Sequence, residues 1–146
     1  MSLLNEDTLK DIALAQNVIT NEDVSVVVVD YGKIWRKKKG YGIRPFLEVI
    51  EEMGDEIHDS VIGDSILGRA SSLLCRYSKV RAVYSPQATK TAIALLIMGS
   101  IPAQVDKLIP FIKNRDGSGL YTFEKMLENI DEPKKAYNFL KEKVLK

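Results

Sequence analysis

The sequence has little of the two residue types that cross-link chains and bind soft metals: its 146 residues include one cysteine and one histidine. A single cysteine, Cys75, excludes a disulfide bond within the chain and is typical of a protein in a reducing cytoplasm. Cys75 lies beside an apolar stripe with helical spacing, so we expect it to be buried as a small apolar side chain. His58 has no second histidine as a companion, and we expect it at the surface.

An excess of one charge is also absent. The chain has 21 lysine and arginine residues against 20 aspartate and glutamate residues, so no field of the whole molecule attracts nucleic acid or an anionic membrane. The longest apolar run, 91–98, is far shorter than the ~20 residues that span a bilayer. The polar residues at 5–7 do not fit a secretory leader, and residues 1–3 are assigned no role. We therefore expect a cytoplasmic protein with no membrane partner and no nucleic acid partner.

The clearest structural signal lies in the stretch 59–77. Val61 and Ile62 begin a short apolar run, and residues 63–65 are typical of a turn. Four apolar residues then follow with the spacing of a helix that has one buried face: Ala70, Leu73, Leu74 and Tyr77. A strand, a turn and a helix in this order predict a βα unit. Such units bring the N–H groups of a helix's first turn to the carboxyl edge of a sheet, where α/β proteins tend to bind ligands.

The same patterns predict the remaining elements. Further helices are expected at 5–17, 43–53, 89–98, 122–130 and 131–144, and further strands at 24–29, 34–35, 81–84 and 101–105. Ser85-Pro86 is expected to turn the chain, and Pro102 favours an edge position for the last strand. The order predicts one domain over 1–146 with a three-layer α/β/α architecture, in which helices flank a mixed five-stranded sheet. Its core spans about 5–106, and a C-terminal loop and helical extension span about 107–146.

The element order resembles the cytidine-deaminase-like fold, and three segments resemble one uncharacterised prokaryotic family that is assigned this fold and has no established activity. They are 42–45 (Gly-Ile-Arg-Pro), Asp64 with 68–70 (Gly-Arg-Ala), and 110–117 (Pro-Phe-Ile-Lys-Asn-Arg-Asp-Gly). The resemblance covers about 24–139. Members of that family carry a cysteine and a proline a few residues after the third segment. This sequence has Leu-Tyr-Thr-Phe at 120–123, and only Glu124 matches.

The resemblance also bears on metal chemistry. Catalytic deaminases of this fold hold zinc with a histidine or cysteine at one helix start and two cysteines at the next, beside a glutamate that transfers protons. The corresponding helix starts here, 42–45 and 64–72, contain neither residue type, and a catalytic zinc ion needs three protein ligands. We therefore expect no metal, no cofactor and no zinc-dependent deamination. The residues do not decide whether the protein is an enzyme of another kind.

Arg44 occupies the position of the first metal ligand in those enzymes. In one interpretation it is a cation at a helix N-terminus that binds a phosphate or carboxylate in the crevice. A cation there opposes the helix dipole, which is a reason to expect an anionic partner. In the other interpretation Arg44 forms a surface ion pair with Asp64 or with a carboxylate of a helix turn.

The next helix start offers a second candidate site. Asp64 and Ser65 are typical N-cap residues. Arg69 and Ser71, in the first two turns, are candidates to join backbone N–H groups in holding an anion. Gly68 allows either a close approach of the backbone to a ligand or tight packing of the helix on the sheet.

A glycine-rich loop carries three polar side chains in sequence, those of Asn114, Arg115 and Asp116. The loop is either a connection built on an Asx-type turn or a binding element. In the second case Arg115 presents its guanidinium group to a phosphate or carboxylate, and Asp116 orients it. The basic run 36–39 also allows two interpretations, nucleic-acid binding or a solvated sheet edge that lysines protect from pairing. Its position after a hairpin strand favours the edge.

Two functions follow from these residues. The first is a small-molecule binding protein, or an enzyme without a metal, whose crevice binds a small anionic ligand such as a nucleotide or sugar phosphate. The candidate ligand-binding residues are Arg44, Asp64, Arg69, Ser71, Asn114, Arg115 and Asp116. The alternative is a protein–protein interaction or oligomerisation module, most simply a C₂ homodimer. Its surface would be formed by the aromatic residues Tyr31, Trp35 and Tyr41.

Overall fold

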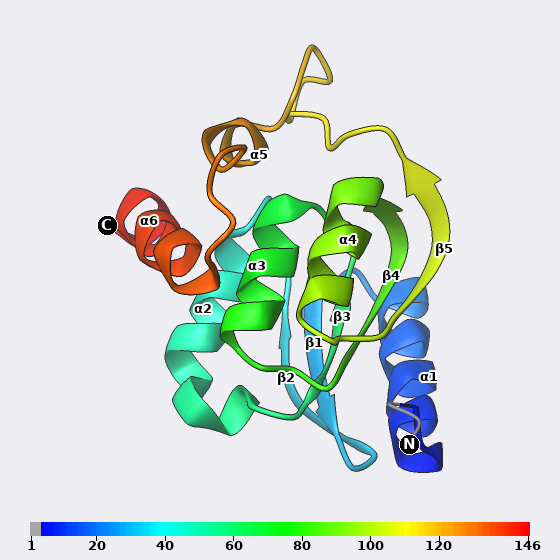
Figure 1. Cartoon of the computed structure of the whole chain (residues 1–146). Coiled ribbons are helices and arrows are strands. Elements are labelled where there is room, and N and C mark those ends of the chain that lie inside the picture. Colours follow the sequence, from blue (N-terminus) through cyan, green and yellow to red (C-terminus); the bar gives the residue numbers. More distant parts are fainter. Residues whose placement is uncertain (1–3) are drawn as a thin grey trace.

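A mixed five-stranded sheet forms the centre of the molecule. The computed structural model describes residues 4–146, so Met1, Ser2 and Leu3 lie outside the described residues. The strands are β1 (Val26–Asp30), β2 (Lys33–Lys38), β3 (Val61–Asp64), β4 (Ala82–Thr89) and β5 (Ala103–Ile109). They lie in the order β2-β1-β3-β4-β5 (Figure 1). β1 is antiparallel to β2 and β3, whereas β3, β4 and β5 are parallel, so the predicted mixed sheet is confirmed.

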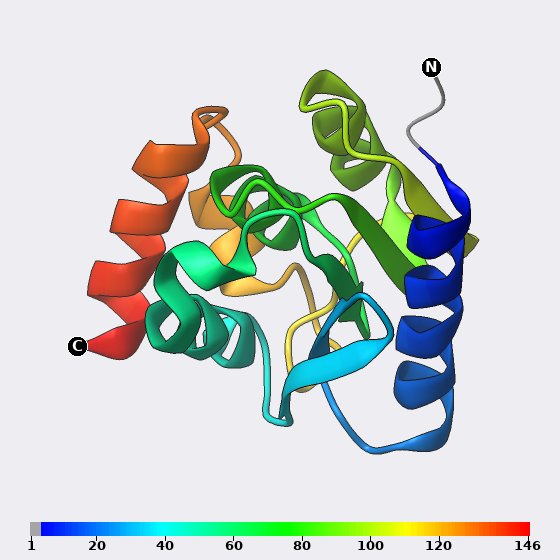
Figure 2. The ribbon, with the colours of Figure 1, turned by 90° about the horizontal axis from the view of Figure 1, so that it is seen from below.

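Helices cover both faces of this sheet. The helices are α1 (Glu6–Asn21), α2 (Arg44–Met53), α3 (Arg69–Tyr77), α4 (Lys90–Met98), α5 (Thr122–Met126) and α6 (Pro133–Leu145), with a 3₁₀ turn, η1 (Gly54–Ile57), after α2. α1 packs on one face, and α2, α3 and α4 pack on the other. Figure 2 shows α1 and α6 at opposite sides of the molecule, with the sheet between them. The predicted arrangement of helices around the sheet is therefore confirmed.

The C-terminal helix α6 is more than an extension. It packs against α2 and α3, and its buried side chains join the main core: Ala136, Tyr137, Leu140 and Val144. The rings of Tyr137 and Tyr77 stack with centroids 4.0 Å apart. The apolar stripe of α6 is removed from water because the helix folds back onto α2 and α3.

Two expectations about the later strands have different outcomes. The predicted turn at Ser85-Pro86 is wrong, because β4 continues through it to Thr89 and stays paired with β5. The fixed φ of proline is compatible with an extended strand, and the Ser85 hydroxyl accepts a hydrogen bond from the Gln87 N–H on the other side of Pro86. The edge position that Pro102 suggested for the last strand is confirmed, since β5 ends the sheet.

The predictions for Cys75, His58 and the basic run 36–39 are confirmed. Cys75 is fully buried in the core, and His58 is exposed. The basic run lies on and just after the edge strand β2, where Arg36 and Lys38 pair with Glu52. No helix within the described residues is long and apolar enough to cross a bilayer.

A buried ion pair, which the sequence pattern did not indicate, joins α1 to the sheet. Asp11 is 1% exposed and contacts the guanidinium group of Arg81 at 2.6 Å. The same carboxylate accepts hydrogen bonds from the backbone N–H groups of Tyr31 and Gly32 in the β1–β2 turn. Arg81 also contacts Asp30 at 3.1 Å. These contacts fix the hairpin and α1 to the start of β4.

Candidate functional site

A cavity of about 240 Å³ lies beside the end of β3, between the first turns of α2 and α3. Its third side is formed by the segment 112–124, which follows β5. Aromatic rings of Tyr41, Phe46 and Tyr121 supply much of the wall, and two carboxyl groups, those of Asp64 and Glu124, also line it. The cavity is therefore largely apolar with a small number of polar groups, as is typical of small-molecule sites.

Asp64 is the last residue of β3 and is only 7% exposed. Burial raises the pKa of its carboxyl group to about 7, and the nearby charge of Glu124 adds to this effect. Hydrogen bonds from the Ser71 side chain and the Ile66 N–H oppose the increase, but the second of these is long, at 3.4 Å. Asp64 therefore keeps its proton to a higher pH than an exposed aspartate does. The expectation that it caps α3 is wrong, because the N-cap residue is Gly68.

The N-terminus of α3 is occupied by a carboxylate of the chain itself. The two side-chain oxygens of Glu124 accept hydrogen bonds from the backbone N–H groups of Arg69 and Ala70, each at 2.8 Å. A Cβ atom at Gly68 would lie 2.2 Å from a Glu124 oxygen, so only glycine allows this approach. The guanidinium group of Arg69 contacts Asp131 and the Ile130 carbonyl instead of the cavity. Arg69 therefore does not join an anion cradle at this helix end.

The N-terminus of α2 is closed from the same segment. The phenolic oxygen of Tyr121 accepts a hydrogen bond from the Ile43 N–H at 3.1 Å, and burial raises the pKa of the phenol. Gly42 has φ +67°, and a Cβ atom there would lie 2.2 Å from the Tyr121 oxygen. Tyr121 and Glu124 thus hold one segment against two helix N-termini, and two glycines make room for them.

A shallow, positively charged groove adjoins the cavity, because Tyr41 and Tyr121 line both. The groove is also lined by Arg44, Arg115 and Lys143. Within the described residues, none of these three cations forms an ion pair. The guanidinium group of Arg44 donates a hydrogen bond to the carbonyl of Val144 in α6, so the interpretation in which Arg44 pairs with Asp64 or with a carboxylate of a helix turn is wrong. The guanidinium carbon of Arg115 lies 4.1 Å from the ring centroid of Tyr41.

The loop that contains Arg115 is held together by its own hydrogen bonds. The Asp116 carboxylate accepts hydrogen bonds from the backbone N–H and the hydroxyl of Ser118, which lower the pKa of the carboxyl group. Asn114 accepts hydrogen bonds from the N–H groups of Gly117 and Gly119. Asp116 thus stabilises the turn and does not orient Arg115. The loop has the Asx-type geometry, while its arginine remains directed at Tyr41 in the groove.

The structure separates the seven candidate residues into two neighbouring places. Four of them line the groove: Arg44, Asn114, Arg115 and Asp116. Asp64 and Ser71 line the cavity, and Arg69 lines neither. Sequence reasoning did not identify Tyr121 and Glu124 as site residues. The available signals were the agreement of Glu124 with the family pattern and the two glycines at the helix starts. Among residues 4–146, no group of three or more histidine, cysteine or acidic residues is placed to hold a metal ion.

Comparison with known proteins identifies a family without an established activity. A crystal structure of a DUF1893 family protein (TM1506) from Thermotoga maritima matches this fold with a TM-score of 0.82, covering 96% of this chain and 92% of that chain. The two sequences are 20% identical, so the likeness concerns the fold alone. No curated protein matches the sequence. Residues 14–144 match the family described as TM1506, a domain of unknown function (DUF1893). Since this match spans most of the chain, the protein belongs to the DUF1893 family.

Proposed function

We propose that this protein has a cytidine-deaminase-like fold without zinc chemistry and binds a small anionic molecule across the cavity and the groove. The observation that carries the proposal is that Tyr41 and Tyr121 line both hollows. The two hollows are therefore neighbours with the packed rings of Tyr41 and Tyr121 at their boundary, and a ligand that extends past these rings would place one part in the cavity and another part in the groove. A nucleotide or a related heterocycle with a phosphate group has these two parts.

The cavity suits a flat, polar ring. The rings of Tyr41, Phe46 and Tyr121 offer apolar surface, and Asp64 with Ser71 offers hydrogen bonds at the inner end. With a pKa of about 7, Asp64 is present near neutral pH both as a carboxylate that accepts and as a carboxylic acid that donates. A heterocycle with an N–H group or a ring nitrogen satisfies either form.

The groove suits the anionic part. Arg115, Arg44 and Lys143 supply three positive charges against the one negative charge of Asp116. Arginine binds phosphate oxygens through paired N–H donors. The stacking of Arg115 on Tyr41 leaves the edge of the guanidinium group available for such bonds. Arg44 has a second role, because it also holds the carbonyl of Val144.

A thermal-shift screen of nucleosides, nucleotides and sugar phosphates at low salt tests the proposal. A ligand at about 100 times its Kd stabilises the folded state by roughly 2.7 kcal/mol, which raises Tm by several degrees. We expect nucleotides to raise Tm and Arg115→Gln to remove most of that increase. Arg36→Gln is the matched control, because Arg36 pairs with Glu52 on the edge strand β2. Arg44→Ala is less informative, since it also releases α6.

The contrast between a nucleoside and its nucleotide separates the two parts of the site. A nucleoside shift that Arg115→Gln leaves unchanged, together with a nucleotide shift that it removes, supports one ligand across both hollows. No shift from any compound contradicts the proposal. Equal shifts in Arg115→Gln and in the unchanged protein contradict the role of the groove.

A second candidate function, an oligomerisation module, is favoured by the outer face of α4. Ile97 and Met98 are 69% and 67% exposed there, and the edge strand β5 packs beside the helix. Of the aromatic surface expected from the sequence, Tyr41 packs on Tyr121, while Tyr31 and Trp35 stay exposed. A homodimer through α4 predicts that Ile97→Lys dissociates it in sedimentation equilibrium. A monomer at micromolar concentration contradicts this function.

A further inference from the structure

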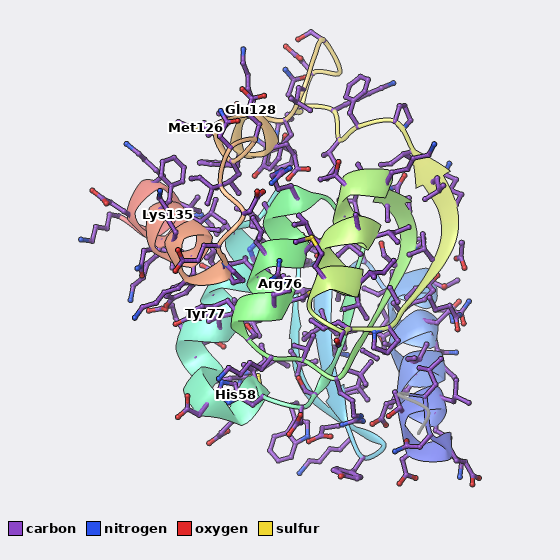
Figure 3. All side chains as sticks on the ribbon, in the orientation of Figure 1. His58, Arg76, Tyr77, Met126, Glu128 and Lys135 are labelled. Atoms are coloured by element: carbon purple, nitrogen blue, oxygen red, sulfur yellow. The ribbon has the colours of Figure 1, made fainter. Side chains whose placement is uncertain are left out.

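A second hollow, of about 640 Å³, lies at the other end of α3. It is bounded by α2 and η1, by the C-terminal end of α3, and by the N-terminal end of α6. Figure 3 shows Arg76 and Tyr77 toward the lower end of α3, with His58 below them, whereas Met126 and Glu128 lie near α5 at the opposite end. The hollow is therefore separate from the cavity and groove of the proposed function.

Two residues that line this hollow each carry a buried polar atom with no partner within the described residues. The Nη1 atom of Arg76 is buried without a hydrogen bond, and the guanidinium group forms no ion pair there. The stem of Arg76 packs tightly on Gly99, where a Cβ atom would lie 2.9 Å from Cγ of the arginine. The Ser78 hydroxyl, on a residue that is 1% exposed, also has no hydrogen bond. Buried polar groups normally have partners, and a buried unpaired cation is costly.

The N-terminus of α6 contributes further donors to the hollow. α6 has 13 residues, begins at Pro133, and its N-cap residue Glu132 makes no side-chain capping bond. Its first turn contains Lys134 and Lys135 and no acidic residue. Backbone N–H groups in the first turn of a helix have no partner within the helix and bind anions readily. The two lysines, which oppose the helix dipole, make the same place more positive.

The acidic residues around the hollow offset only part of its positive charge. Glu51 is already in contact with Lys141 at 2.9 Å, whereas Asp55 lies 3.8 Å from His58, which compensates its charge only when the imidazole is protonated. Glu132 is exposed at the rim. Within the described residues, Arg76, Lys79 and Lys134 form no ion pair, although all three line the hollow. An added anion therefore meets more uncompensated positive charge than negative charge.

We propose that this hollow is a binding site for the phosphate group of a phosphate monoester. The guanidinium group of Arg76, the hydroxyl of Ser78 and the first-turn N–H groups of α6 would donate hydrogen bonds to its oxygens. Phosphate suits the site better than a carboxylate, because it has three terminal oxygens and nearly two negative charges. Ligand binding in the cavity and groove is not required for this site, so the two proposals stand or fall separately.

The test is a titration of the ¹⁵N-labelled full chain with inorganic phosphate, followed by NMR at constant ionic strength. We expect the amide signals of Ser78, Lys79, Lys134 and Lys135 to shift together with one Kd. Arg76→Gln should weaken this Kd by roughly 10-fold or more, since a hydrogen bond to a charged group is lost. Lys10→Gln, which changes an exposed residue of α1 on the opposite face of the sheet, should leave the Kd unchanged. Glycerol 3-phosphate should give the same shifts, and acetate should bind much more weakly.

Several outcomes would overturn the proposal. These are the absence of shifts at the four amides, shifts confined to the loop 114–119, and an unchanged Kd in Arg76→Gln. Equal binding of acetate would overturn the assignment to phosphate. The signals of the core residues in the same spectra report whether each variant is folded. If Arg76→Gln does not fold, Ser78→Ala provides the same comparison, with a smaller expected loss of affinity.

Discussion

Arg76 and Arg81 lie on either side of the turn between α3 and β4, and their surroundings are opposite. The Arg81 guanidinium group contacts Asp11 at 2.6 Å, Asp30 at 3.1 Å and the Thr8 hydroxyl at 2.8 Å. The Arg76 guanidinium group has no hydrogen bond or ion pair within the described residues, although its Nη1 atom is buried. The first arrangement is that of a charge that holds the fold together. The second is that of a charge that the described residues do not compensate, as the proposed phosphate site requires.

The two ends of α3 differ in the same way. At the N-terminus the Glu124 carboxylate accepts two backbone hydrogen bonds, so the chain supplies its own anion. At the C-terminus the Ser78 hydroxyl is buried without a partner. A helix end whose polar groups are already hydrogen-bonded by the chain is therefore poor evidence for a ligand. An end with unsatisfied polar groups is better evidence. The four predictions below test this distinction, from the largest expected effect to the smallest.

Arg81→Met should destabilise the protein most. The substitution leaves the carboxylate of Asp11, which is 1% exposed, without its counter-charge. Breaking a buried pair in this way costs about 5 kcal/mol in the free energy of unfolding. Urea denaturation measures the loss. Arg36→Met is the control, because its partly exposed pair with Glu52 should contribute less than about 1 kcal/mol. Similar losses in both variants would contradict the assigned role of Arg81.

Asp64→Asn should change how stability depends on pH. Burial raises the pKa of Asp64 from its ordinary 3.8 to about 7, so the folded protein binds this proton more tightly than the unfolded chain. Asp64 therefore contributes most to the free energy of unfolding below about pH 4, where it is protonated in both states. This contribution declines as the pH rises to about 7 and does not change further above that. The total decline is roughly 4 kcal/mol.

Urea denaturation between pH 4 and pH 8 checks this prediction. The unfolding free energy of Asp64→Asn minus that of the unchanged protein should increase through this window and level off above pH 7. Taking the difference cancels the titration of the other acidic residues. Parallel pH profiles would show that Asp64 titrates at its ordinary pKa. Asp64 would then be a carboxylate, and not a hydrogen-bond donor, in the cavity at neutral pH.

Glu124→Ala should cost about 3 kcal/mol, because it leaves the N–H groups of Arg69 and Ala70 without their charged acceptor. Urea denaturation measures this loss as well. Glu128→Ala is the matched control, since Glu128 is exposed on the same segment and caps no helix. A loss below about 1 kcal/mol for Glu124→Ala would mean that the α3 N-terminus is satisfied in another way, for instance by water or a bound anion.

The local parts of the fold could be predicted from the sequence, and the parts that depend on distant contacts could not. The βα unit at 61–77 has its signal in adjacent residues, and the structure has β3 and α3 there. Pro86 was interpreted as a turn because the pairing partner that keeps β4 extended lies in β5, later in the chain. Hydropathy patterns report which face of one element is apolar. They carry no information about which later strand lies beside it.

The same limit applies to the candidate site. The groove residues Arg44 and Arg115 were identified from a family resemblance, but the contacts that decide their roles are remote in sequence. Glu124 binds the Arg69 N–H across 55 residues, and Arg81 binds Asp11 across 70 residues. A polar residue such as Asp11 looks like a solvent-exposed position until its partners are known. The glycines at positions 42 and 68 were the one local indication that another segment approaches these helix starts.

Arg76→Met should have the smallest effect on stability, although it is the same substitution as Arg81→Met. In phosphate-free buffer the loss should be within about 0.5 kcal/mol, because replacing a partly buried, unpaired cation by an apolar side chain of similar length removes a desolvation cost and no partner. Added phosphate should stabilise the unchanged protein and leave Arg76→Met nearly unaffected. If Arg76→Met instead loses several kcal/mol in phosphate-free buffer, then Arg76 is a structural charge like Arg81. The contrast between the two arginines, and the phosphate site that rests on it, would then be wrong.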